Sequence, residues 1–189
     1  LFDDFKRMIE SMLRVSEHED GYVAVSSVPH AATGFLYMAA SVAALHWNSW
    51  SLLNRLLNDK FEWYFMSGRP LFSFGFNMEY FFHVEAFERH ASAIHDFYQQ
   101  VLSQPEYLRI LNLDQDSFLT IYVQTQMVQS LRAAQEVEKG SSRAMWPDFG
   151  RYHEYRVERL LDRVWADAQF AENFCALFDE APETWKKSL

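Results

Sequence analysis

Residues 31–45 have the sequence AATGFLYMAASVAAL, and this stretch decides the fold. No Asp, Glu, Lys or Arg occurs anywhere from Gly21 to Asn54, and residues 31–45 are apolar or small around every side of a helix. A helix of this kind is normally buried on all sides by other helices. The sequence therefore predicts a central helix, which begins at Pro29 and whose alanines allow its neighbours to approach closely.

A membrane span is the alternative interpretation of the same stretch. Its apolar run is about 17 residues at most, which is shorter than the roughly 20 residues that a bilayer requires. The polar residues His46, Asn48 and Ser49 follow the run. We therefore expect a helix inside a protein core and no membrane partner.

The hydrophobic period is helical along most of the remaining chain. Apolar residues between Phe2 and Leu13 recur at helical spacing and predict an amphipathic first helix. Similar patterns predict helices at about residues 50–57, 77–102, 116–139, 152–168 and 171–179. Residues 61–76 instead form an irregular, aromatic-rich connector around a turn, where a short pair of strands could form. The predicted fold class is all-α, a multi-helix bundle of about seven or eight helices joined by this connector.

The composition is that of one globular domain. The chain has 189 residues, of which 49% are hydrophobic and 23% are charged, and this length suffices for one sizeable core. It starts at Leu1 without an initiator Met or a secretory leader, so we expect residues 1–189 to be a single helical domain from a longer chain. The net charge of −9 repels phosphates and disfavours nucleic acid as a partner.

The single cysteine, Cys175, allows no internal disulfide, which suits a reducing cytoplasm. It lies between Phe174 and Ala176 in an apolar helical pattern. Free cysteine is usually buried, so we interpret Cys175 as a small core residue and not as a nucleophile. We expect a cytoplasmic protein.

Familiar catalytic and metal-binding motifs do not occur in the sequence. It has no glycine-rich phosphate loop, no Gly-x-Ser-x-Gly elbow and no His-Glu-x-x-His motif. Glu79 and His83 are four residues apart and could chelate one metal ion, but His90 lies about 10.5 Å further along the helix axis than His83. Carboxylate sites in helical bundles need a Glu-x-x-His motif on each of two helices, and no second copy is present. We therefore expect no metal and no cofactor.

Arg89 and His95 resemble the Arg-x(4–6)-His pattern of HEPN-type ribonucleases, which are helical bundles. The resemblance would make Arg89 the phosphate clamp and His95 the group that acts on the 2′-hydroxyl of RNA. The two residues are six apart and lie about 120° from each other around a helix. The other interpretation is a solvated helix face, because Glu85, Glu88, Ser92, Asp96 and Gln99 lie on the same polar side. A ribonuclease that uses these two residues is the alternative function.

Two segments resemble the helical C-terminal regions of large bacterial proteins of the antiphage-defence type. One is Pro29–Leu57, and the other is the run Trp-Pro-Asp-Phe-Gly-Arg-Tyr at residues 146–152. In such proteins the N-terminal part is often a sirtuin-type NADase, a nuclease or an ATPase module. The resemblance implies an accessory or sensor region whose effector lies elsewhere.

The expected function is that of a noncatalytic helical domain that binds protein, either its own missing domains or a sensed partner. Large rigid aromatic side chains are good anchors of protein interfaces. The predicted partner-binding residues are the connector aromatics Trp63, Tyr64, Phe72 and Phe74. A ligand pocket lined by Phe76, Tyr80 and His83 is a further interpretation, which rests on aromatic density alone.

Overall fold

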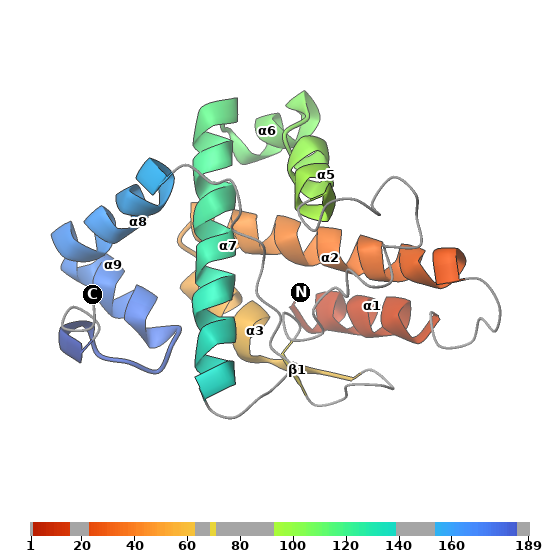
Figure 1. Ribbon diagram of the computed structural model, residues 1–189, viewed down its shortest axis with the longest axis horizontal. Coiled ribbons are helices and arrows are strands. Elements are labelled where there is room, and N and C mark those ends of the chain that lie inside the picture. The colour runs from red at the N-terminus through yellow and green to blue at the C-terminus, as the bar shows by residue number, and fades with distance from the viewer. Residues whose placement is uncertain (1, 16–22, 63–68, 71–92, 139–153, 185–189) are drawn as a thin grey trace.

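The computed structural model describes residues 2–15, 23–62, 69–70, 93–138 and 154–184 (Figure 1). In these ranges the chain forms an all-α arrangement, as the hydrophobic periodicity predicts. The first helices are α1 (Phe2–Val15), α2 (Val23–His46) and α3 (Trp50–Asn58). The later helices are α5 (Ala93–Leu102), α6 (Pro105–Leu111), α7 (Gln115–Glu138), α8 (Glu154–Ala166) and α9 (Ala168–Ala176).

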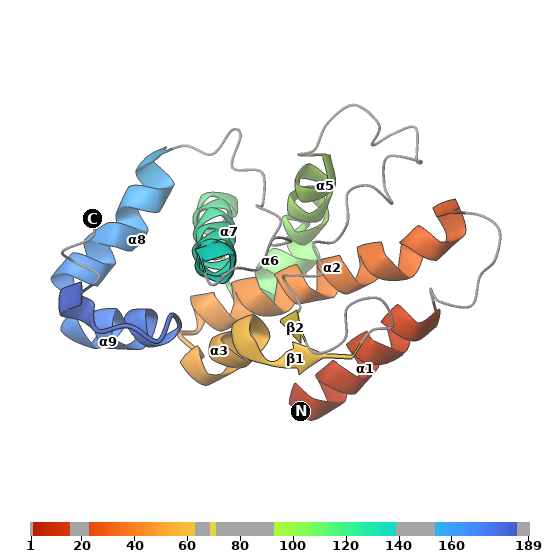
Figure 2. The same ribbon diagram turned by 60° about the horizontal axis from the view of Figure 1, so that its bottom comes forward.

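Two short strands form part of the expected connector. The strand β1 (Lys60–Phe61) pairs antiparallel with β2 (Arg69–Pro70), with Lys60 opposite Pro70 and Phe61 opposite Arg69. In the turned view of Figure 2 this pair lies beside α3 and α1. The strand pair that the sequence allowed is therefore present, and Phe61 of β1 is fully buried.

The helix α2 lies at the centre, as its sequence predicts. The amphipathic helix α1 packs along it, and α7 crosses it steeply (Figures 1 and 2). The prediction that the helix begins at Pro29 is wrong, because α2 already begins at Val23 and continues through Pro29. Packing against neighbouring helices supplies most helical stability in proteins and outweighs the loss of one backbone donor at a proline.

Among the described residues, two hydrophobic clusters form the core, and α2 and α7 contribute to both. The first cluster joins α1, α3, α8 and α9 to these two helices, through buried side chains such as Ile9, Leu56, Leu160 and Phe174. The second joins α5 to them through Met38, Val42, Tyr98, Leu102, Phe118 and Tyr122. Ile121 of α7 is half-buried and packs against both clusters. Cys175 is fully buried in the first cluster, which confirms its interpretation as a core residue.

Candidate functional site

The residues that the sequence singles out for function fall mostly outside the described ranges. This holds for Trp63, Tyr64, Phe72 and Phe74 of the connector and for Arg89. His95 lies in α5, but its side chain is outside the described part of the structure. Glu79 and His83 are also outside it. Within the described ranges, the side chains that stand out are therefore ones that the sequence did not indicate.

Two large apolar side chains are exposed where the C-terminal end of α2 meets α6. Trp47 follows α2 directly and is 57% exposed, and Ile110 on α6 is 68% exposed. The neighbouring residues hold these segments together, because His46 Nε2 lies 2.9 Å from the carbonyl oxygen of Leu111. We call Trp47 and Ile110 the exposed pair. Trp47 follows His46 and Ile110 precedes Leu111, and the contact between His46 and Leu111 holds α6 against the end of α2.

The central helix α7 buries an unusual number of polar side chains. Seven of them are buried along one helix: Thr120, Gln124, Thr125, Gln126, Gln129, Ser130 and Arg132. Some have clear partners within the fold. The hydroxyl of Thr125 donates to the carbonyl oxygen of Ile121 over 2.8 Å, and Gln124 Nε2 donates to the carbonyl oxygen of Arg156 over 3.1 Å. Most buried polar groups in proteins are satisfied in this way.

A second set of buried polar side chains lies on α2, which packs against α7. On α2, Thr33, Tyr37 and Ser41 recur every four residues and therefore share one side of the helix. We call these three residues, together with Gln126, Gln129 and Ser130 of α7, the polar seam. All six side chains are buried, and none carries a formal charge. The seam thus places neutral hydrogen-bonding groups in the middle of an apolar core.

The hydroxyl of Tyr37 connects the two halves of the seam. Burial raises its pKa, because a phenolate would be poorly solvated there, and the nearby Ser41 and Gln129 side chains oppose part of that rise. Tyr37 therefore stays neutral throughout the physiological pH range. The seam contains no group that titrates near neutrality.

Two hydroxyl groups of the seam have no hydrogen-bond partner among the described residues, namely Oγ1 of Thr33 and Oγ of Ser130. The side chains of Ser41 and Gln129 instead hydrogen-bond with Tyr37 and so lower its pKa against the effect of burial. An unsatisfied buried polar group costs about 1–3 kcal/mol.

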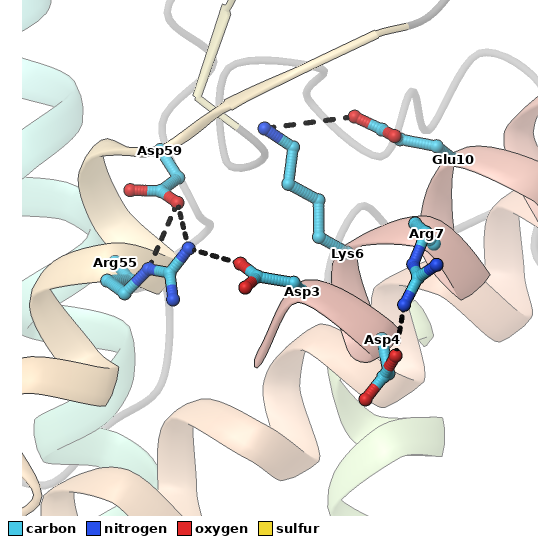
Figure 3. Close-up of polar contacts among 7 residues, drawn as sticks. All are labelled: Asp3, Asp4, Lys6, Arg7, Glu10, Arg55 and Asp59. Carbon is cyan, nitrogen blue, oxygen red and sulfur yellow. Dashed lines mark hydrogen bonds and ion pairs between the residues drawn. The ribbon is translucent and has the colours of Figure 1, made fainter. Parts of the chain in front are cut away.

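Ion pairs fasten α1 to α3 on another face, and Figure 3 shows their arrangement. Arg55 of α3 donates to Asp3 of α1 over 2.7 Å and to Asp59 over 3.1 Å. Its guanidinium also stacks 3.9 Å from the ring centroid of Phe2. Each charge of Arg55, Asp3 and Asp59 has a partner within the fold. We therefore assign this cluster a structural role.

The described residues contain no group of three His, Cys, Asp or Glu side chains that could hold a metal ion. Although α2 has 24 residues, no helix in the described ranges combines the length and apolarity that crossing a membrane requires. Comparison with family models, with curated proteins and with solved structures gives no match to this chain. The exposed pair and the polar seam are thus the features from which a function has to be argued.

Proposed function

We propose that the chain is a noncatalytic helical domain that binds another protein, as an accessory or sensor part of a larger cytoplasmic protein in a bacterial defence system. The observation that carries this proposal is the exposed pair. Trp47 and Ile110 expose large apolar side chains, and tryptophan is among the residues that contribute most at protein interfaces. The assignment to a defence system rests on the resemblance of Pro29–Leu57 and residues 146–152 to the helical C-terminal regions of bacterial antiphage-defence proteins.

A comparison within the chain supports the assignment of Trp47 to an interface. Trp50 lies only three residues later, and its ring packs edge-on against Phe170 with centroids 5.0 Å apart. The fold thus has a place in its core for one of these two tryptophans. Trp47 is left with more than half of its surface in water, although the hydrogen bond of His46 holds its backbone in place. An exposed aromatic side chain on a backbone segment that is already held in place needs less ordering on binding a partner.

The charge of the chain indicates the kind of partner. With a net charge of −9, the domain repels nucleic acid and strongly acidic proteins at long range. A protein surface that offers an apolar recess with a neutral or basic rim would complement the exposed pair. Either a further domain of the same protein or a separate protein would meet this description.

The test compares two surface variants of the chain. Trp47→Ser combined with Ile110→Ser removes the exposed pair, and Met8→Ser removes an exposed apolar side chain on α1 as the matched control. Partners retained by the wild-type chain are identified by mass spectrometry, and their dissociation constants are then measured with purified proteins. We expect the double variant to lose at least tenfold in affinity while keeping its melting temperature, and the control to bind normally.

Two results would contradict the proposal. A purified partner that binds the double variant as tightly as the wild type would show that the exposed pair is not the interface. In that case Trp63→Ala and Tyr64→Ala test the connector, which the sequence favours. A large fall in melting temperature of the double variant would instead show that the exposed pair serves stability.

A further inference from the structure

The helix α6 is the most weakly embedded of the described helices. None of its seven residues is buried, whereas every other described helix contributes buried side chains to the core. Its backbone also packs only sparsely against the other described elements. A helix this short does not persist in water by itself, because isolated helices need about 12–15 residues even to be marginally stable. A few side-chain contacts therefore keep α6 in its place between α5 and α7 (Figures 1 and 2).

The contacts that hold α6 on the fold are of two kinds. Leu108 and Leu111 are half-buried and pack against the second hydrophobic cluster, and the ring of Tyr107 meets that of Phe35 edge-on, with centroids 6.2 Å apart. The polar contact is the one from His46 Nε2 to the carbonyl oxygen of Leu111. A carbonyl oxygen can only accept, so Nε2 carries the proton in this contact. Carbonyl groups in the last turn of a helix have no partner within it, and His46 satisfies one of them.

The chain leaves the helical conformation on both sides of α6. Gln104 precedes the helix with φ −66° and ψ 146°, and Asn112 follows it in the left-handed region with φ 54° and ψ 47°. These two residues separate α6 from α5 and α7, so changes of their backbone angles would move α6 without bending its neighbours. Segments with few buried contacts open at a lower free-energy cost than core helices do.

We propose that α6 is a strap that opens while the rest of the domain stays folded, and that His46 holds it closed. Trp47 stands at the end of the well-packed helix α2, whereas Ile110 stands on α6. Opening of the strap therefore separates the two members of the exposed pair. The consequence for binding rests on the proposed function: a partner that contacts both residues binds the closed strap and holds it closed. His46 is then a positioning residue, because it acts on this surface only through the place of α6.

Amide hydrogen exchange of the full chain, followed by NMR, tests the proposal without a partner. The N–H groups of Asn112 and Leu113 report on α6, because they bond to the carbonyl oxygens of its last turns. Thr125 and Val128 are fully buried in α7 and report on the core. We expect the α6 amides to exchange about 100-fold faster or more than the core amides, after correction for their intrinsic rates. Low urea should accelerate the core amides and leave the α6 amides nearly unchanged, because local opening exposes little surface.

Three variants test the role of His46. His46→Leu removes the donor but keeps a side chain of similar size, and it should speed exchange of the α6 amides by about fivefold, the effect of one hydrogen bond. His46→Gln keeps an N–H donor and should restore much of the wild-type protection. Asn173→Ala is the control, because it removes a bond of the same type on α9, from the Asn173 side chain to the carbonyl oxygen of Gln169. It should leave the α6 amides unchanged.

The strap is ruled out if Asn112 and Leu113 exchange with the same protection and urea dependence as Thr125 and Val128, since α6 then opens only when the whole domain unfolds. The role of His46 is ruled out if His46→Leu leaves the exchange of the α6 amides at the wild-type rate.

A second measurement tests the link to binding. The purified partner that the wild-type chain retains should slow exchange of the α6 amides when it is added in excess, but not in the Trp47→Ser, Ile110→Ser variant. Binding to the wild-type chain without this slowing overturns the link. Failure of the proposed function looks different, because the partner then binds the double variant as tightly as the wild type, while the free chain still shows fast exchange in α6.

Discussion

Arg156 of α8 donates from its Nη2 atom to the Oδ1 atom of Asp116 at the start of α7, over 2.8 Å. The two side chains differ sharply in environment, since that of Arg156 is 7% exposed and that of Asp116 is 65% exposed. Arg156 Nη1 donates in addition to the backbone carbonyl of Asp116 over 2.9 Å and to Thr120 Oγ1 over 2.6 Å. The guanidinium thus fastens α8 to α7 mainly through groups other than the carboxylate.

This asymmetry predicts unequal effects of two substitutions. Arg156→Ala should lower the free energy of unfolding by about 3 kcal/mol or more, because it leaves buried acceptors without a donor. Asp116→Asn should lower it by about 1 kcal/mol or less, because an exposed partner contributes little and the other bonds of Arg156 remain. Urea denaturation measures both. If both substitutions lower the free energy of unfolding equally, the ion pair between Arg156 and Asp116 supplies most of the stabilisation.

Substitutions of Trp47 and Trp50 should have different effects on the free energy of unfolding. Trp50→Ala removes a half-buried ring that packs against Phe170, and we expect it to lower the free energy of unfolding by about 2–3 kcal/mol. Trp47→Ala changes an exposed position, and we expect an effect within about 0.5 kcal/mol. Denaturation followed by circular dichroism compares them. A loss for Trp47→Ala as large as that for Trp50→Ala would contradict its assignment to an interface.

Asp167 begins α9 and stabilises its first turn. Its carboxylate accepts a hydrogen bond from the backbone N–H of Phe170 over 3.0 Å, which is the usual contact of a helix N-cap. Asp167→Ala should lower the free energy of unfolding by about 1 kcal/mol. Ser49 holds the same position before α3 but makes no side-chain capping bond, so Ser49→Ala is the control and should change little. Similar losses in both variants would show that the capping bond is not the cause.

The contact between Asp3 and Arg55 predicts how stability depends on pH. The hydrogen bond and the charge of Arg55 lower the pKa of Asp3 below its ordinary value of 3.8. Folded Asp3 therefore binds protons less well than unfolded Asp3, and its contribution is present above pH 3.8 and lost as the pH falls through the lower folded value. Asp3→Asn should thus lower the melting temperature at neutral pH, and the difference from wild type should shrink in acid.

The control for this prediction removes the partner. In an Arg55→Met background, Asp3→Asn should change the melting temperature at neutral pH much less, because only the weaker effects of the N-terminus and Arg7 on Asp3 remain. If the melting temperature of the Arg55→Met variant still falls as steeply with decreasing pH, other carboxylates cause the pH dependence. Asp114 is one of these, because the backbone N–H and the hydroxyl of Ser117 lower its pKa as well.

The sequence predicted α1, α2, α3, α7, α8 and α9 but was less reliable about where helices begin and end, and residues 77–92 of another predicted helix lie outside the described ranges. The predicted helix at about 116–139 corresponds to α7, because its length and helical period outweigh its many polar residues. After Leu102 the sequence predicts a break near Pro105. Proline in fact opens the short helix α6 there, since the first helical position needs no backbone donor. Likewise, the boundary between α8 and α9 lies at Asp167, whose capping contact the hydrophobic period does not reveal.

The exposed pair and the polar seam could not be predicted, for opposite reasons. Trp47 comes directly after the apolar helix α2. Whether its side chain is buried depends on which other segments lie beside the end of that helix, and the sequence does not reveal this. Gln126, Gln129 and Ser130 have side chains that usually face solvent, and the packing of α7 against its neighbours buries them. The cue that was available is that α7 has apolar and polar residues on all its sides, which is unusual for a helix at a surface.

The crossing of α2 and α7 also has a consequence for how the chain is made. Gln129 follows Tyr37 by about 90 residues, so a ribosome releases the apolar helix α2 long before the helix that completes its cover. During that interval α1, α3 and later α5 are the described helices that can pack on it. Nascent chains that stop before α7 leave exposed the part of α2 that α7 covers, and we expect these unfinished chains to aggregate or to recruit chaperones.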